Sequence, residues 1–202
     1  MKIKNVIFDV GNVLVKWAPY EVIEAVFPDV DPKIFFQQMR LVWIDLNLGK
    51  LSINKAVDLY HEQFHLSKNK LSQLMMEFIY HQVPLEGSVE LLNKLKKLQV
   101  NLFSITDNIK EIMAYHHQYS EFPRYFKDII VSAEVKILKP DIRIYQYLLN
   151  KHNLIPGESV FIDDVIANVE GAMSAGMQAF QFINTHSCEK QIFTLLETTN
   201  YA

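Results

Sequence analysis

The sequence predicts an α/β fold, a doubly wound parallel sheet with an all-helical segment inserted after its first strand. Two observations carry this prediction. Five short apolar runs recur along the chain, and each closes on a polar residue, as buried parallel strands do. Segments with helical spacing separate most of these runs, an alternation typical of doubly wound sheets. With 202 residues, 50% of them hydrophobic, the chain is long enough for one compact core with an insertion.

The predicted strands follow one another at residues 6–8, 100–105, 129–131, 160–162 and 179–183. Helical spacing is found at 89–98, 142–149 and 165–172. Residues 17–83 interrupt this rhythm with helical stretches at 20–27, 32–48, 53–64 and 71–81. We therefore expect residues 1–16 and 84–202 to form the α/β core, and residues 17–83 to form a helical cap domain.

Charge and composition narrow the function classes. The chain has 20 basic and 23 acidic residues and a formal net charge of -3, which gives no electrostatic footprint for nucleic acid or an anionic membrane. Its single cysteine, Cys188, excludes an internal disulfide or a cysteine-based zinc site, and we interpret it as structural. No stretch approaches the length of a transmembrane helix or a signal sequence. The expectation is a soluble, cytoplasmic protein with a small molecule as its partner.

Polar side chains stand where the predicted strands end. Asp9 follows the first strand, Thr106 the second, and the adjacent Asp163 and Asp164 the fourth. In open parallel sheets, ligands bind at the carboxyl ends of the strands. Carboxylates gathered there repel one another unless a cation is bound, and ligands that are all oxygen favour Mg²⁺ over Zn²⁺. Because Lys139 can add a positive charge at the same edge, the set suits a phosphoryl group that one carboxylate attacks.

The segments that contain these residues resemble the four motifs of the haloacid dehalogenase (HAD) superfamily, with its Rossmann-like core. The motif segments are residues 8–14, 104–107, 139–145 and 161–177, so the resemblance covers nearly the whole chain. The insertion, with Trp43 and residues 49–52, resembles the helical cap between the first two motifs in that superfamily's small-substrate phosphatases. The Asp-x-Gly-Asn-Val form of the first motif is most similar to the branch that includes bacterial α-D-glucose-1-phosphate phosphatases.

The resemblance implies a nucleophile and a metal site. Asp9 would be the nucleophile that forms an aspartyl-phosphate. Mg²⁺ would be held by Asp9, the backbone carbonyl of Gly11 and Asp164, with Asp163 as an auxiliary ligand. Asn168 would orient the acidic pair. The implied activity is that of a Mg²⁺-dependent phosphatase acting on a small phosphorylated metabolite, most simply a sugar phosphate.

The resemblance also implies phosphate-binding roles for Thr106 and Lys139, with Asp107 beside them. Asp107 departs from the branch, which usually has Asn there, and an extra carboxylate repels phosphate unless it is paired or protonated. Gly11 departs from most phosphatases of the superfamily, which have at this position an Asp that serves as general acid and base. The absence of that Asp indicates either slow turnover or a leaving group that departs without protonation by a general acid. A glycine would be required there only for a positive φ or a close approach to the metal.

Two histidine patterns suggest rival sites. His61 and His65 match the His-Glu-x-x-His metalloprotease motif, and on a helix both would lie on one face. We interpret them instead as a partly exposed polar face of a cap helix. His116 and His117 are adjacent, so they do not face each other on a helix, and we interpret both as surface residues.

Two alternatives to a phosphatase remain open. A haloacid dehalogenase-type hydrolase would share the nucleophile Asp9 and the cap, but it needs no metal, and the Asp163–Asp164 pair argues against it. A catalytically weak binding or regulatory member of the fold is the second alternative, motivated by Gly11 and Asp107.

Overall fold

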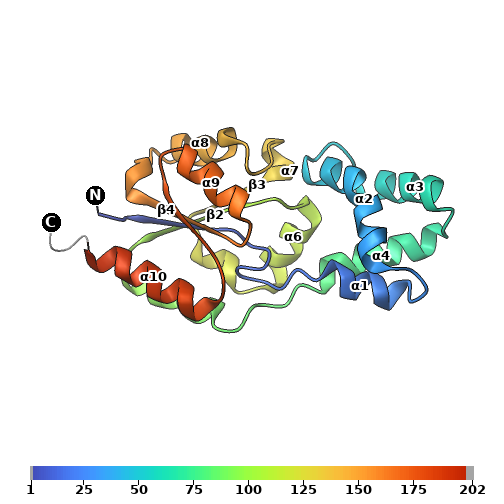
Figure 1. Ribbon diagram of the computed structural model, residues 1–202, viewed down its shortest axis with the longest axis horizontal. Helices are drawn as coiled ribbons and strands as arrows, with labels where there is room; N and C mark the ends of the chain where they lie inside the picture. The colour runs from blue at the N-terminus through green and yellow to red at the C-terminus, as the bar shows by residue number, and fades with distance from the viewer. Residues whose placement is uncertain (1, 199–202) are drawn as a thin grey trace.

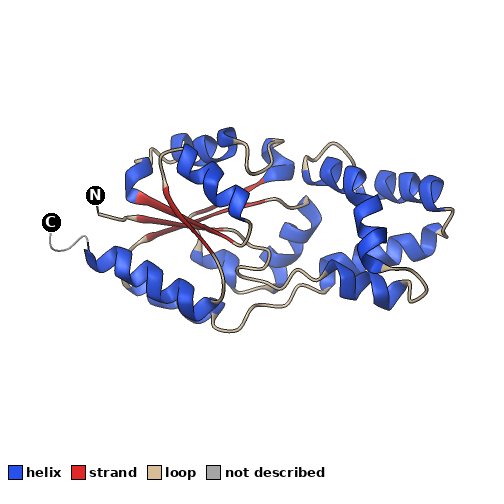
Figure 2. Cartoon of the chain, viewed as in Figure 1, coloured by secondary structure: helices blue, strands red, loops and turns tan. Residues whose placement is uncertain are grey.

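The computed structural model describes residues 2–198, and its centre is a five-stranded, all-parallel sheet with the strand order β3-β2-β1-β4-β5. The strands are β1 (Asn5–Phe8), β2 (Asn101–Thr106), β3 (Asp128–Val131), β4 (Ser159–Asp163) and β5 (Gln178–Gln181). Figure 2 shows these strands running between layers of helices. The predicted fold class is confirmed.

Helices cover both faces of the sheet. They are α5 (Ser88–Lys97), α6 (Lys110–Tyr119), α7 (Ser132–Val135), α8 (Ile142–Lys151), α9 (Ile166–Ser174) and α10 (Thr185–Thr198), with 3-10 turns η1 (Phe122–Tyr125) and η2 (Pro156–Glu158). Successive side chains of a strand point to opposite faces. Val6 and Phe8 of β1 pack in one buried cluster with residues of α5 and α10, while Ile7 packs in another with residues of α8 and α9. Figure 1 shows α8 and α9 on one side of the sheet and α10 on the other.

Four helices form an insertion between β1 and α5, beyond one end of the sheet (Figure 1). They are α1 (Pro19–Val26), α2 (Pro32–Asn47), α3 (Ile53–Phe64) and α4 (Lys68–Tyr80). The sequence starts two of these helices with capping residues. Asp31 accepts hydrogen bonds from two backbone amides at the start of α2, and Ser52 accepts one at the start of α3. The insertion has its own buried cluster, which also takes in Ile109 and Ile112 from beside and within α6.

The element boundaries differ from the predicted ones by a few residues at most, and α3 covers the predicted range 53–64. Helices α6, α7 and α10 are not among the predicted helical segments. Helix α6 has only three fully buried residues, so its sequence carries a weak apolar pattern. No helix in the described part of the chain is long and apolar enough to cross a membrane.

Candidate active site

The carboxyl ends of the three central strands bring predicted site residues together. Phe8 of β1 pairs with Ser104 of β2 and with Ile162 of β4, so the positions just beyond these residues share one edge of the sheet. Asp9 directly follows β1, and its amide donates to the carbonyl of Ile162. Thr106 and Asp163 are the last residues of β2 and β4, and both are buried. The strand order reverses at β1, and such a switch point is where open α/β sheets bind ligands.

Lys139 lies between two of the carboxylates. Its Nζ is 2.8 Å from Oδ1 of Asp9 and 2.7 Å from Oδ2 of Asp163, and its side chain is 1% exposed. The lysine belongs to the loop between α7 and α8, where α9 packs closely. A Cβ on Gly171 of α9 would lie 2.6 Å from the carbonyl oxygen of Pro140, so only glycine allows this approach. Close packing of α9 therefore helps to set the position of Lys139.

Asp163 has partners for both of its carboxylate oxygens. The Asn168 side chain donates to Oδ1 and Oδ2 at 3.0 and 3.1 Å, and the amide of Val165 donates to Oδ1 at 2.8 Å. Together with Lys139, these donors account for a carboxylate with no solvent exposure. In this arrangement, Asp163 fixes the ammonium group of Lys139.

Asp164, in contrast, is only partly buried, and its carboxylate accepts a hydrogen bond from the side chain of Asn12. The Nδ2 atom of Asn12 lies 3.3 Å from Oδ2 of Asp164. The Oδ1 atom of Asn12 accepts from the amide of Trp17 at 3.0 Å. Asn12 has a φ of 53°, in the left-handed region that Asn tolerates better than most residues. It therefore connects the loop after β1 both to the acidic pair and to the start of the insertion.

The extra carboxylate of Asp107 is paired. Its Oδ1 accepts a hydrogen bond from the backbone amide of Lys139 at 3.1 Å. Burial raises the pKa of Asp107, and the nearby charge of Lys139 opposes that rise. The sequence predicts that a carboxylate here repels phosphate unless it is paired or protonated, and the structure shows Asp107 paired.

Negative charge exceeds positive charge at the site. Burial raises the pKa of Asp9 to about 7, against the lowering effect of Lys139, and Asp163 adds to the rise. Burial also raises the pKa of Asp164. Burial lowers the pKa of Lys139, but the three carboxylates of Asp9, Asp163 and Asp107 outweigh it, so its pKa lies above the ordinary value. Lys139 is therefore charged, and its neighbours favour a further cation.

The donor set fits a hard divalent cation. Asp9, Asp163 and Asp164 each offer one oxygen, and these oxygens lie within 4.8 Å of one another. Within residues 2–198 this is the one group of three or more metal-ligating side chains. No nitrogen or sulfur ligand joins it, which is the chemistry expected for Mg²⁺. Because the oxygens of Asp163 already have partners, Asp9 and Asp164 are better placed to ligate an ion.

Asp9 and Asp164 face a cavity of about 250 Å³ between the sheet and the insertion, whereas Asp163 lies buried beneath it. The core contributes predicted site residues to its wall, namely Asp9, Gly11, Thr106, Asp107, Lys139, Asp164 and Asn168. The insertion and its connections contribute Trp17, Trp43, Asn47 and Gln82. A Cβ on Gly11 would meet only the Cβ of Trp17, at an ordinary 3.7 Å, and its φ is not in the left-handed region. A Cβ at position 11 therefore meets no steric obstacle.

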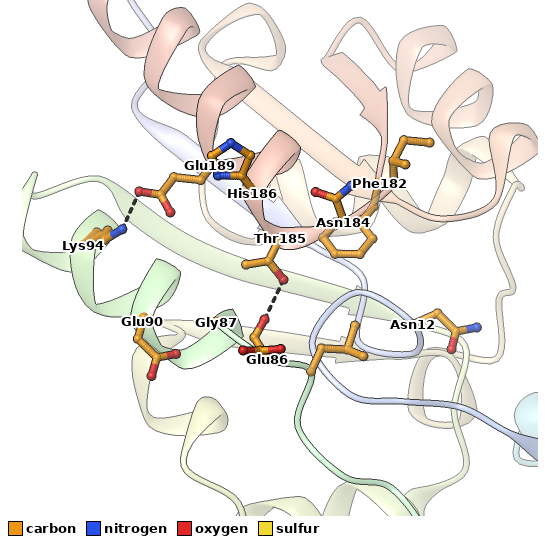
Figure 3. Close-up of a pocket in the computed structure, with 12 residues that line it drawn as sticks. Asn12, Glu86, Gly87, Glu90, Lys94, Phe182, Asn184, Thr185, His186 and Glu189 are labelled. Carbon is orange, nitrogen blue, oxygen red and sulfur yellow. Dashed lines mark hydrogen bonds and ion pairs between the residues drawn. The ribbon is translucent and has the colours of Figure 1, made fainter.

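A second cavity of about 640 Å³ lies between α5 and the start of α10 (Figure 3). Figure 3 shows Lys94 paired with Glu189, and Thr185 donating to the carbonyl of Glu86. Asn12 lines both cavities, but none of the clustered carboxylates lines this larger one. The smaller cavity is therefore the candidate active site.

The rival histidine patterns do not form a metal site in the described part of the chain. His65 lies just beyond α3 with a left-handed φ of 56°, and the Nδ1 atom of His61 pairs with the carbonyl of Leu66. Neither joins the metal-ligating group. The interpretation of His116 as a surface residue is wrong, because it is fully buried and its ring nitrogens pair with Ser120 and Gln82. His117 is exposed, as expected.

Sequence reasoning missed the amide side chains of Asn12, Asn47 and Gln82. Asn12 could have been predicted, because it lies inside the first motif, three residues after Asp9. Asn47 and Gln82 belong to no motif, and only the packing of the insertion against the sheet brings them to the cavity. Cys188 is buried in the core, and burial raises the pKa of its thiol to about 12, which agrees with a structural role.

The fold and the site together define an α/β protein with a buried lysine beside three clustered carboxylates. The sequence matches the haloacid dehalogenase-like hydrolase family over residues 6–182, and the chain belongs to that family. This confirms the resemblance seen in the four motifs.

Curated relatives are similar over nearly their whole length. Sesquiterpene phosphatase astK of Aspergillus oryzae is 25% identical over 86% of this chain and 87% of its own. D-ribitol-5-phosphate phosphatase of Bacteroides thetaiotaomicron is 23% identical over 97% of this chain and 100% of its own. Both names describe phosphatases, with leaving groups that differ widely in size and polarity.

Solved structures share the fold. A HAD family enzyme from Bacteroides thetaiotaomicron has a TM-score of 0.78 at 19% identity, over 92% of this chain and 96% of its own. That enzyme has also been crystallised with magnesium and inorganic phosphate. L-2-haloacid dehalogenase from Xanthobacter autotrophicus has a TM-score of 0.69 at 15% identity, over 95% of this chain and 83% of its own. The fold therefore hosts both chemistries, and the site has to distinguish them.

Proposed function

We propose that the chain is a Mg²⁺-dependent phosphatase that hydrolyses a small, uncharged sugar or polyol esterified with one phosphate. The observation that carries this proposal is the group of three carboxylates within 4.8 Å, held beside the buried ammonium of Lys139. A haloalkanoate carries its own negative charge but needs no metal, so a cluster of this kind would not help its hydrolysis. The phosphatase relatives support the same choice.

In the proposed reaction, an oxygen of Asp9 attacks phosphorus and the bond from phosphorus to the ester oxygen breaks. The electron pair leaves with that oxygen, which takes up a proton, and an aspartyl-phosphate remains on the enzyme. Water then attacks this phosphorus and releases inorganic phosphate, which regenerates Asp9. Lys139 and Thr106 bind the phosphoryl oxygens, and Lys139 stabilises charge that develops on them. Bound by Asp9, Asp164 and the Gly11 carbonyl, Mg²⁺ would neutralise further charge on the phosphoryl group.

The insertion has a proposed role of its own. We propose that residues 17–83 are a cap domain on a core of residues 1–16 and 84–202, and that the cap excludes water from the cavity. A cavity of about 250 Å³ is below the usual range for drug-sized ligands. It suits a small phosphate ester better than a nucleotide or a sesquiterpenyl phosphate.

Hydrolysis of p-nitrophenyl phosphate with and without Mg²⁺ tests the proposal, followed by a panel of phosphorylated metabolites. We expect phosphate release that needs Mg²⁺ and is lost with EDTA. Parallel incubation with 2-chloropropionate measures chloride release. Chloride release without phosphate release would establish the dehalogenase alternative, and the absence of both would favour a binding or regulatory role.

A further inference from the structure

A groove on the insertion shares one wall with the cavity of the candidate active site. It has a volume of about 540 Å³ and lies between α2 and the start of α1. Trp17 and Trp43 line both the groove and that cavity, and their rings are stacked, with centroids 5.5 Å apart and planes 19° apart. The other residues that line the groove do not line the cavity, so the groove is a separate site with a shared aromatic wall.

Packed aromatic rings line the groove. The ring of Phe36 lies edge-on to those of Trp17 and Tyr20, with centroids 6.4 and 5.9 Å away, and 6.2 Å from that of Trp43. Tyr20 is 45% exposed, and the other three rings are only partly buried. Rings that fix one another in place and still meet solvent offer a rigid surface on which a flat ligand can stack.

Two basic side chains border the same groove. Lys33 and Arg40 are seven residues apart on α2, so they lie on one face of the helix, about 10 Å apart along its axis. Both are exposed, and neither has an ion-pair partner in the described part of the chain. None of the described residues that line the groove is acidic, and Glu21 of α1 already pairs with Lys16 at 2.7 Å. The groove therefore attracts an anion, whereas carboxylates outnumber Lys139 in the neighbouring cavity.

We propose that this groove binds a nucleotide, a ligand that joins a flat aromatic base to phosphate groups. The base stacks on the aromatic rings between α1 and α2, and the phosphate oxygens pair with Arg40 and Lys33. Arginine suits this role because its planar guanidinium donates two parallel hydrogen bonds to a phosphate. A volume of about 540 Å³ lies within the range of small-molecule sites. No step of the proposed phosphatase reaction takes place in the groove, so the inference does not rest on that function.

Tryptophan fluorescence reports on the groove, because Trp17 and Trp43 are the only tryptophans in the sequence. Three probes are titrated in EDTA, so that Mg²⁺-dependent hydrolysis does not occur. They are α,β-methylene-ADP, which carries base and anion, adenosine, which carries the base alone, and methylenediphosphonate, which carries the anion alone. We expect α,β-methylene-ADP to bind at least about tenfold more tightly than either of the others. Equilibrium dialysis measures any binding that leaves the fluorescence unchanged.

Charge and ring variants separate the two parts of the proposed contact. The double variant Lys33→Gln, Arg40→Gln should weaken binding of α,β-methylene-ADP about tenfold or more and leave that of adenosine unchanged. Tyr20→Ser should weaken binding of both base-containing probes. The matched control is Lys55→Gln, Lys70→Gln, which removes the same charge from exposed residues of α3 and α4 that do not line the groove. It should bind all three probes as the wild type does.

Four outcomes would overturn the inference. The wild type could fail to bind α,β-methylene-ADP, or the control could lose as much affinity as the double variant, which would indicate only general attraction of charge. Full competition by Mg²⁺ with inorganic phosphate would place the nucleotide in the cavity of the candidate active site. Sedimentation with phosphatidylglycerol vesicles in place of nucleotide binding would assign the groove to a membrane surface. Thermal melts identify a variant that fails to fold, and if the double variant does, Arg40→Gln alone decides.

Discussion

Installing an acid at position 11 tests how the leaving group obtains its proton. Gly11 lies two residues after the proposed nucleophile and lines the cavity of the candidate active site. Its φ is outside the left-handed region, and a Cβ there meets only the Cβ of Trp17 at 3.7 Å. The Cβ of Gly11→Asp therefore needs no strained backbone and displaces no neighbour. A thermal melt of the variant then shows whether the fold accommodates its whole side chain.

The expected gain follows from the role of the added carboxyl group. A positioned general acid contributes about 10²–10⁴-fold to a rate, or about 2.7–5.4 kcal/mol of barrier. The new group must be protonated to donate. It would join a site where burial, with a smaller effect of Asp163, already raises the pKa of Asp9 to about 7, so its own pKa should rise too. We expect about a tenfold or larger increase in kcat for alkyl phosphates and little change for p-nitrophenyl phosphate.

The assay is kcat across p-nitrophenyl, phenyl and primary alkyl phosphates at saturating Mg²⁺. The wild-type rate should fall steeply as the leaving group becomes more basic, and Gly11→Asp should flatten that dependence. Gly11→Asn is the control, because it adds nearly the same shape without an ionisable proton. Equal wild-type rates for aryl and alkyl esters, with chemistry rate-limiting, would refute the reasoning. Asp107 would then be the first proton donor to test.

Three further predictions concern the carboxylates and the buried histidine. Asp9→Asn should keep the fold and lower turnover at least about a hundredfold, roughly 2.7 kcal/mol of barrier, and near-normal activity with Mg²⁺ present would contradict its role as nucleophile. In activity titrations with Mg²⁺, Asp164→Ala should not be rescued at any reachable concentration, whereas Asp163→Ala should need more metal, and the opposite ranking would reverse their roles. Burial, with a smaller effect of His117, lowers the pKa of His116 to about 4 in the folded protein. Between about pH 6.5 and about 4, the unfolded chain therefore binds a proton at His116 that the folded protein does not. Stability should fall by about 3 kcal/mol as the pH drops from about 6.5 to about 4, and urea unfolding should lose this part of the pH dependence in His116→Gln but keep it in His117→Gln.

The central strands and the residues at their ends were predictable from the sequence for one physical reason. A buried parallel strand has to be apolar on both faces, so the point where it meets the ligand edge is marked by the first polar residue. Asp9, Thr106 and Asp163 stand at such points, and the parallel register brings them to one edge. Lys139 was predicted at the same edge from its place before Pro140 and the next helix, but its contacts with Asp9 and Asp163 were not, because it lies on a loop whose path depends on Pro140 and α9.

The other half of the cavity was not predictable, because it depends on how the insertion packs. Nothing in the local sequence of Asn47 separates it from any other asparagine at the end of a helix. Its place in the cavity depends on Ser132 and Gly49, which join α2 to α7 across a long stretch of chain. The same limit explains the error on His116. Helical periodicity does not show that the His116 ring is buried against Gln82, which lies between α4 and α5.

The charges of the site also explain why the two acids of the adjacent pair should not be interchangeable. Asp163 gives its oxygens to Lys139, Asn168 and a backbone amide, so its negative charge is used within the protein. Asp164 is more exposed and lines the cavity, and its carboxylate accepts a hydrogen bond from Asn12, so its charge stays directed toward the cavity. A cation that binds there gains the attraction of Asp164 and Asp9 without breaking the ion pairs beneath them. Lys139 is held in place before substrate arrives, and such preorganised charge is what stabilises a phosphoryl group during its transfer.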